Sequence, residues 1–275
     1  MSILLALLYG IIQGITEFLP VSSSGHLAIA QNIFNMENVE ASYFSFDILL
    51  HLATLVAVFI VFYKDIFSLI PAFFTMLGKV FKGKFKLSEY TDTERFVIYV
   101  IIATLPLALI VPFKDYIDLI GNHTKIVGII LLFNSVMLFV SDKLTKSNVT
   151  LENAKPRNAL LVGLCQMLAV LPGLSRSGST ITGGLLQGFD RSFAVKFSFI
   201  LSIPAILGAN LLSVTDAFAN PIPSSDIPAY IVGFVAAALT GIAAMKLLMY
   251  ISKKNNFRIF SYYCFAAGLV AIIFG

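Results

Sequence analysis

Long apolar runs separated by short polar stretches dominate this chain. Six of the runs are close to the roughly 20 residues that a helix needs to cross the hydrocarbon core of a membrane. They predict membrane-spanning helices over residues 44–63, 95–113, 125–141, 194–215, 229–250 and 257–275. Two further apolar runs, 3–19 and 158–171, end in stretches rich in Pro, Gly and Ser. The pattern therefore predicts six spans and two irregular segments.

The two irregular segments follow Leu19 and Leu171. Backbone that leaves the helical conformation at membrane depth has to be buried in protein or to line a wet cavity, because lipid cannot satisfy its hydrogen-bonding groups. We therefore predict two re-entrant helical hairpins, over residues 3–34 and 158–189, which enter the membrane and return to the same side.

The positions of Lys and Arg test this topology, because basic residues are retained in cytoplasmic loops. Loops 64–94, 142–157 and 251–258 contain several Lys and Arg residues, whereas loops 31–43 and 216–228 contain none. If every apolar run crossed the membrane, 216–228 would be cytoplasmic and 251–258 external, against that rule. With two re-entrant hairpins, all three basic loops are cytoplasmic. The first hairpin then enters from outside and the second from inside.

Composition agrees with this topology. Of the 275 residues, 58% are hydrophobic and 12% are charged, about half of the ~25% charged residues in soluble domains. This composition excludes a soluble enzyme, a disordered chain and a nucleic-acid-binding domain. The net charge of +4 is no signal for nucleic acid, because in a membrane protein the positions of Lys and Arg set the orientation of the loops. The predicted fold class is an all-α polytopic membrane protein.

The two halves of the chain resemble each other. At a constant offset of 153 residues, one set of positions matches another: Gly10, Gln13, Ser22, Ser24 and Gly25 match Gly163, Gln166, Ser175, Ser177 and Gly178. Since the two hairpins enter from opposite sides, this favours an inverted-topology repeat of residues 1–145 and 155–275. Such repeats place a site near the midplane, where the broken helices meet. Chance similarity between apolar segments is the alternative.

Ionisable residues in or beside the apolar runs indicate where a site lies, because a charge near the bilayer centre costs at least about 2.5 kcal/mol. They are Glu17, His26, Asp47, His51 and Arg176. Three serines at 22–24 precede His26, and a hydroxyl near an imidazole is the minimal nucleophile–base pair. A hydrogen bond between helices is the alternative role for His26. Asp47 and His51 share a helix face and are expected to support the site rather than react.

Arg176 lies in surroundings that suit phosphate. Its planar guanidinium offers paired donors to phosphate oxygens, and glycines and hydroxyls at a helix start let further donors approach an anion. The expected phosphate-binding residues are Ser22, Ser24, Gly173, Ser175, Ser177, Gly178 and Thr180. A structural ion pair between Arg176 and Glu17 is the alternative.

At these residues the sequence resembles the undecaprenyl-diphosphatase family, the bacitracin-resistance type of integral membrane phosphatase. Residues 13–26 and 172–180 are similar to its two long motifs, and residues 46–51 and 197–204 also fit. The resemblance implies a fold of six spans and two re-entrant hairpins in the bacterial plasma membrane, with a site open to the external face. It implies removal of the terminal phosphate of undecaprenyl diphosphate, which recycles the lipid carrier for peptidoglycan synthesis.

The expected catalytic residues are Glu17, Ser23, His26 and Arg176. Three roles remain open. Ser23 attacks the terminal phosphorus with His26 as base, or His26 is itself the nucleophile, or His26 activates a water molecule. The resemblance also implies a divalent cation, Mg²⁺ or Ca²⁺, which Glu17 and Gln13 are expected to hold through oxygen atoms.

Two positions depart from the family pattern. Gln13 stands where the family usually has Glu, and Cys264 stands where many members have Arg. The first departure leaves Glu17 as the one carboxylate of its motif, and the second removes a phosphate contact.

A transporter is the alternative function, because an inverted repeat with two broken hairpins is also a transporter architecture. Such a protein would carry a polyprenyl phosphate or another anion through the same site. The expected partners are a polyprenyl diphosphate and membrane lipids, without nucleic acid, and the assembly is left open between a monomer and a homodimer.

Overall fold

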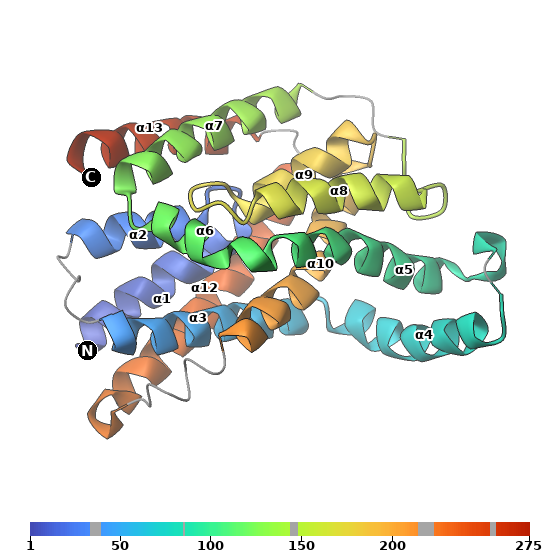
Figure 1. Cartoon of the computed structure of the whole chain (residues 1–275), viewed down its shortest axis with the longest axis horizontal. Coiled ribbons are helices and arrows are strands. Elements are labelled where there is room, and N and C mark those ends of the chain that lie inside the picture. The colour runs from blue at the N-terminus through green and yellow to red at the C-terminus, as the bar shows by residue number, and fades with distance from the viewer. Residues whose placement is uncertain (34–39, 85, 144–147, 214–222, 254–256) are drawn as a thin grey trace.

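The computed structural model describes residues 1–33, 40–84, 86–143, 148–213, 223–253 and 257–275 (Figure 1). This part of the chain is helical, with one isolated bridge between Val149 and Phe189. The α-helices are α1 (Ile3–Phe18), α2 (Ser23–Ile33), α3 (Glu40–Val61), α4 (Tyr63–Phe81), α5 (Asp92–Thr104), α6 (Lys114–Gly121), α7 (Thr124–Asp142), α8 (Pro156–Leu168), α9 (Arg176–Leu186), α10 (Arg191–Leu212), α12 (Ile227–Lys253) and α13 (Arg258–Phe274). The predicted all-α class is confirmed.

Several of these helices are long and apolar enough to cross a membrane. Among the described residues they are Asp92–Gly121, Thr124–Asp142, Arg191–Leu212 and Ser224–Lys253. The pair α3 and α4 adds a fifth candidate if it is counted as one bent span, and α1 and α13 are shorter apolar helices. The chain is therefore a multi-pass membrane protein.

The interruptions predicted after Leu19 and Leu171 are present between helices, at residues 19–22 and 169–175. α1 ends at Phe18 and α2 begins at Ser23, whereas α8 ends at Leu168 and α9 begins at Arg176. Backbone with positive φ turns the chain in both breaks, at Ser22 (φ 72°) and at Gly173 (φ 96°). Gly173 suits this conformation because it has no Cβ.

One predicted span is interrupted. The predicted span 95–113 lies within the candidate span Asp92–Gly121, but it is not one continuous α-helix, because α5 ends at Thr104 and 3-10 turns at Pro106 and Pro112 lead into α6. Proline lacks the N–H that continues an α-helix. The loop 64–94 contains α4, as the apolar residues among 65–81 predict, and α4 is bent by 91° from α3.

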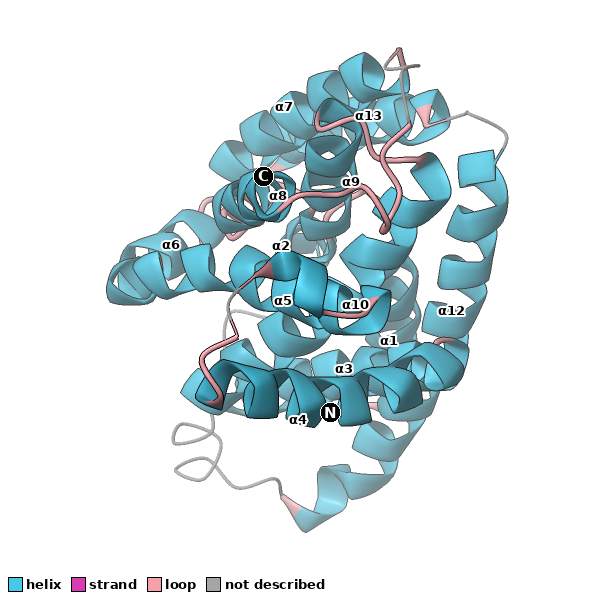
Figure 2. Ribbon diagram, turned by 90° about the vertical axis from the view of Figure 1, so that its right-hand side faces the viewer, coloured by secondary structure: helices cyan, strands magenta, loops and turns pink. Residues whose placement is uncertain are grey.

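Close helix pairs bring the two hairpins into the interior. α1 packs along α12, α8 packs along α5, and α7 packs along α13 (Figures 1 and 2). Glycine makes the first two approaches close, because a Cβ on Gly10 would lie 2.3 Å from the Gly233 oxygen and one on Gly163 would lie 2.5 Å from the Ala103 oxygen. Large apolar side chains such as Phe133 and Leu239 are exposed, as expected for a surface that faces lipid tails.

Candidate active site

The breaks of the two hairpins lie against each other. The hydroxyl of Ser177 donates to the Leu19 carbonyl across the contact, at 3.2 Å. Asn134 of α7 bridges both breaks: its Nδ2 donates to the Pro20 carbonyl at 3.1 Å, and its Oδ1 accepts from the Ser175 amide at 3.2 Å. Asn134 was not among the predicted site residues, although an amide side chain within an apolar span is a sequence signal for such a role.

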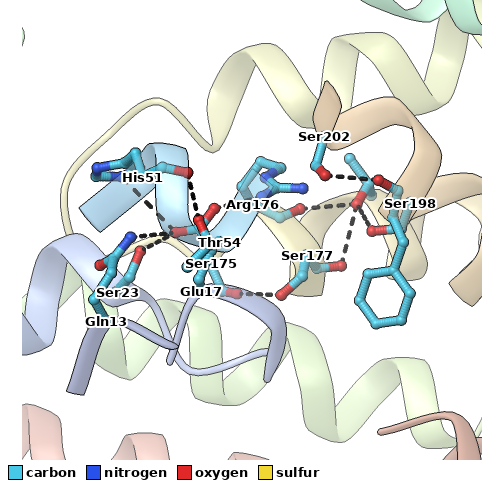
Figure 3. Close-up of polar contacts among 12 residues, drawn as sticks. Gln13, Glu17, Ser23, His51, Thr54, Ser175, Arg176, Ser177, Ser198 and Ser202 are labelled. Carbon is cyan, nitrogen blue, oxygen red and sulfur yellow. Dashed lines mark hydrogen bonds and ion pairs between the residues drawn. The ribbon is translucent and has the colours of Figure 1, made fainter. Parts of the chain in front are cut away.

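Glu17 is the centre of the contact between the hairpins (Figure 3). Its Oε1 accepts from Nη2 of Arg176 at 2.5 Å, and its Oε2 accepts from Oγ of Ser23 at 2.8 Å. The same Oε2 accepts from Nε2 of Gln13 at 3.1 Å and lies 3.8 Å from Nε2 of His51. The predicted association of Glu17, Ser23, Arg176 and Gln13 is therefore present in the structure.

Local backbone geometry places Ser23 beside Glu17. Ser22 is the non-glycine residue with positive φ in the described backbone, a conformation that costs roughly 1–3 kcal/mol and is found mainly at functional sites. Its hydroxyl accepts from the Gly25 amide at 3.2 Å and so caps α2. The turn directs Ser23 toward α1, where Glu17 follows Gln13 by one helical turn.

Arg176 keeps one donor that its ion pair does not use. Its Nη2 binds Glu17, whereas its Nη1 is buried without a hydrogen-bond partner among the described residues. An unpaired buried guanidinium nitrogen is costly unless a ligand satisfies it. The structural ion pair that was the alternative reading is present, and it leaves a donor for an anion.

The expected pairing of Ser23 with His26 is not present in the described structure. The Nδ1 of His26 donates to the Ser22 carbonyl at 2.7 Å, and its Nε2 lies 2.7 Å from the hydroxyl of Tyr263, whose ring stacks on the imidazole. Among the described residues no hydrogen bond joins Ser23 and His26. A histidine three residues after Ser23 points away from it because its Nδ1 bonds back along α2.

His51 is the histidine that faces the centre. Its Nδ1 donates to the Asp47 carbonyl at 2.9 Å, which leaves Nε2 directed at Glu17. The Asp47 carboxylate lies 3.6 Å from Nδ1. The helical spacing therefore predicted the contact between Asp47 and His51. It did not predict that His51 itself faces Glu17.

The candidate phosphate-binding residues divide into two groups. Ser24, Ser175 and Arg176 line the cavity, together with Ser23. The hydroxyls of Ser22, Ser177 and Thr180 bind other parts of the protein: Ser24, Leu19 and Ser198 are among their partners. The amide of Gly178 donates to Ser175 Oγ, and Gly173 shapes the break. Most of the Gly/Ser motif therefore builds the hairpin contact, and fewer residues than expected face the cavity.

A cavity of about 1000 Å³ opens in front of this centre. Glu17, Ser23, His51 and Arg176 line one part, and Lys114 and Asp118 of α6 line another. Most of the remaining wall is apolar side chains from α5, the 3-10 turns that follow it, the break before α9, and α10. A few convergent polar groups in a large apolar pocket are typical of a ligand site.

A divalent cation fits the donor atoms at the centre, although the described residues contain no cluster of three His, Cys, Asp or Glu side chains that could hold one. Gln13 Oε1 is buried without a hydrogen-bond partner among the described residues, while Nε2 of the same amide donates to Glu17 Oε2, so rotating the amide by 180° would turn its oxygen toward the carboxylate. One carboxylate and one amide oxygen suit Mg²⁺, which proteins often bind through one or two side chains together with substrate phosphates.

Comparison with known proteins decides the family. The family model described as bacitracin resistance protein BacA matches residues 6–270. The chain belongs to the BacA family. Proteins named undecaprenyl-diphosphatase are similar over nearly their whole length: that of Methanobrevibacter smithii is 41% identical, over 99% of this chain and 98% of the relative. That of Bacteroides thetaiotaomicron is 40% identical, over 99% of both.

The BacA relatives come from archaea as well as bacteria. The comparisons therefore do not assign this multi-pass membrane protein to bacteria.

Cys264, one of the two departures from the family pattern, is buried behind the first hairpin. Its Sγ accepts from Asn134 Nδ2 at 3.3 Å and lies 3.7 Å from the Pro20 carbonyl. It supports the break there and does not line the cavity.

Proposed function

We propose that the chain hydrolyses undecaprenyl diphosphate to undecaprenyl phosphate and inorganic phosphate. The observation that carries the proposal is the buried Nη1 of Arg176, a donor without a protein partner that lies at the same centre as Ser23 and Glu17. Family membership and full-length relatives with that activity in their names support the same substrate. The product is the lipid carrier that peptidoglycan synthesis uses in bacteria.

Arg176 binds the terminal phosphate in this proposal. Its Nη1 donates to a phosphate oxygen, and its charge neutralises negative charge that develops on the transferred group. Because Nη2 is fixed by Glu17 at 2.5 Å, the guanidinium plane is held in one orientation before substrate binds. Ser24 and Ser175, which also line the cavity, are placed to donate to the same phosphate.

Ser23 is the proposed nucleophile. Its Oγ forms a bond to the terminal phosphorus, the bridging P–O bond breaks, and undecaprenyl phosphate leaves with the electron pair. The Ser23 proton passes to Glu17 Oε2, to which it is already hydrogen-bonded at 2.8 Å. Water then hydrolyses the phosphoserine.

Direct attack by water, with Glu17 as base, is the alternative mechanism. His26 takes no part in either mechanism, because both its ring nitrogens are bonded elsewhere.

A divalent cation, Mg²⁺ or Ca²⁺, would be held by Glu17 and Gln13 together with the substrate. It would supply positive charge that neutralises the diphosphate. Gln13 Oε1 has no hydrogen-bond partner among the described residues, so this oxygen is available as a ligand once the amide turns it toward Glu17.

The proposed topology has six spans and two re-entrant hairpins related by an inverted repeat. Matching hydrogen bonds support the repeat, since Ser22 caps the Gly25 amide at 3.2 Å and Ser175 caps the Gly178 amide at 3.1 Å. Matching helix pairs support it too, because α1 on α12 corresponds to α8 on α5. The site then opens to the external face of the plasma membrane.

Labelling of single cysteines tests this orientation. A cysteine at Ser224 should react with an impermeant maleimide added outside, whereas one at Ser147, which lies outside the described residues, should react only after the membrane is opened. The reverse pattern would refute the re-entrant topology but not the activity.

Phosphate release by purified protein tests the activity. The expected result is one inorganic phosphate per undecaprenyl diphosphate, with release lowered about 100-fold in Glu17→Gln and retained in Glu89→Gln, a carboxylate in a turn after α4. Transport of the lipid or of an anion across a vesicle without phosphate release would favour the transporter and refute the phosphatase.

A further inference from the structure

A second cavity, of about 470 Å³, lies between α3, α4, α5 and α10. We refer to it as the apolar groove. All the residues that line it are apolar, among them Phe59, Phe73, Ile203 and Leu207. None of the groups assigned to catalysis reaches it, so it needs an explanation of its own.

The apolar groove adjoins the active-site cavity. Val100, Ile101 and Pro204 line both. α5 and α10 therefore form one seam, with the Glu17–Arg176 centre in the larger cavity and purely apolar walls in the groove. A ligand with a charged end and a long apolar end matches that order of surfaces.

We propose that the apolar groove holds isoprene units of the substrate's prenyl chain while the diphosphate lies at Glu17 and Arg176. This inference rests on the proposed function, because it takes the prenyl diphosphate as the ligand. The occupant is the substrate's own chain, and a membrane lipid is the competing occupant that the experiment has to exclude.

The groove acts through shape and not through hydrophobicity alone. Lipid tails are as apolar as the groove, so moving a prenyl chain from the bilayer into it gains little transfer free energy. Packing against fixed aromatic side chains such as Phe59 and Phe73 orients the chain instead. A chain held in one direction holds its diphosphate in one position, which favours in-line attack.

The size of the groove limits how much of the chain it takes. A cavity of about 150 Å³ holds one benzene molecule, so about 470 Å³ holds roughly three five-carbon isoprene units. The remaining units stay in the lipid. We therefore expect kcat/KM to rise with chain length over the first few units and then to level off.

The wall formed by α4 is held to the rest of the groove by an ion pair. Lys196 of α10 and Asp65 of α4 lie 2.6 Å apart. The pair joins the two helices that face each other across the groove. α4 is also held to α5, because Ala72 and Met76 pack against Val97 and Lys79 forms an ion pair with the buried Glu94.

Single tryptophans can report on the occupant because the chain contains no Trp. Phe73→Trp places the probe in the groove, and Phe133→Trp on α7, where Phe133 is 62% exposed and lines neither cavity, is the matched control. The ligand is a prenyl diphosphate with bromine, a short-range quencher, on its third isoprene unit. We expect saturable quenching at Phe73→Trp, at least threefold stronger than at Phe133→Trp and reversed by unlabelled undecaprenyl diphosphate.

Equal quenching of the two tryptophans would overturn the proposal. So would quenching of Phe73→Trp by a brominated phospholipid that undecaprenyl diphosphate does not displace, since the groove would then be a lipid site. Leu207→Trp, on the opposite wall, gives the same reading if Phe73→Trp does not fold. Phosphate release is measured on the same samples: release without groove quenching refutes the groove alone, and groove quenching without release refutes the phosphatase alone.

Kinetics give an independent reading. Ile203→Trp fills the groove, whereas Leu239→Trp adds a similar volume at a position 62% exposed on α12. We expect Ile203→Trp to lower kcat/KM for undecaprenyl diphosphate at least tenfold while Leu239→Trp changes it less than twofold. Equal values for the two variants would overturn the groove assignment.

Discussion

The two hairpins share one local design but carry different chemistry. At the offset of 153 residues, Ser22 and Ser175 cap the glycine amides three residues on, and the hydroxyls of Ser22 and Ser24 pair as those of Ser175 and Ser177 do, at 3.3 and 3.1 Å. The residue between the two serines differs: it is Ser23 in the first hairpin and Arg176 in the second.

This difference shows how a repeated unit becomes a catalytic centre. Ser23 and Arg176 occupy equivalent positions, and both bind the one carboxylate of Glu17, which has Val170 as its counterpart. In each hairpin, the capping serine and the glycine amide that it binds fix the same backbone geometry. The chemistry then depends on three side chains that the two hairpins do not share, so substitutions at these positions should be far more damaging than substitutions at the matched ones.

Arg176→Lys is expected to have the largest effect. Lysine keeps the charge but cannot bind Glu17 and a phosphate through two nitrogens in one plane. We expect kcat/KM for undecaprenyl diphosphate to fall about 1000-fold, or about 4 kcal/mol of transition-state stabilisation. Arg258→Lys, in an ion pair with Asp142 away from the cavity, is the control and should lose less than threefold. Turnover of Arg176→Lys near the wild-type rate would show that paired donors are not needed.

Ser23→Ala is expected to have the next largest effect, about 100-fold on kcat. Ser24→Ala is the comparison within the same hairpin, since the Ser24 hydroxyl bonds to Ser22 and not to Glu17, and it should lose less than tenfold. Mass spectrometry of acid-quenched enzyme should find phosphate on the peptide that contains Ser23. If Ser23→Ala keeps more than about a tenth of wild-type activity, a loss below ~1.4 kcal/mol, water is the nucleophile.

His51→Ala should cost more than His26→Ala. His51 faces Glu17 at 3.8 Å, whereas His26 is bonded to Tyr263 at 2.7 Å. We expect a loss of about 100-fold in kcat for His51→Ala, because Glu17, the proposed base, loses the side chain that faces it, and less than about tenfold for His26→Ala. Measured at saturating substrate, the reverse order would place the catalytic histidine in the first hairpin, as its sequence alone suggested.

The matched glutamines offer the smallest and most selective test. Gln13 and Gln166 are both buried, and the Oε1 of each has no partner among the described residues. Gln13→Glu adds a carboxylate beside Glu17 and should lower the Mg²⁺ concentration for half-maximal activity about tenfold. Gln166→Glu, whose side chain faces the Ala103 carbonyl, should leave that concentration unchanged. An equal shift in both would contradict a cation site on the first hairpin.

The sequence was most informative where one physical constraint determined the structure. Apolar length placed helices such as α7 and α10, and Pro, Gly and Ser at membrane depth placed both breaks. It was less informative where the outcome depended on rotamers. Ser23 and His26 share a helix face, yet the imidazole bonds back to the Ser22 carbonyl. Asn134 was missed because its role depends on two backbone groups, at Pro20 and Ser175, that meet only in the fold.

The central claim is that the two hairpins form one catalytic centre through Glu17 and Arg176, and a double-mutant cycle tests it directly. We would measure kcat/KM for undecaprenyl diphosphate in Glu17→Gln, Arg176→Lys and the double variant. Residues that act as a unit are strongly non-additive, so the double variant should be no more than about threefold slower than the worse single variant. Losses that multiply, so that the two single effects combine fully, would show that Glu17 and Arg176 act independently and would contradict the account.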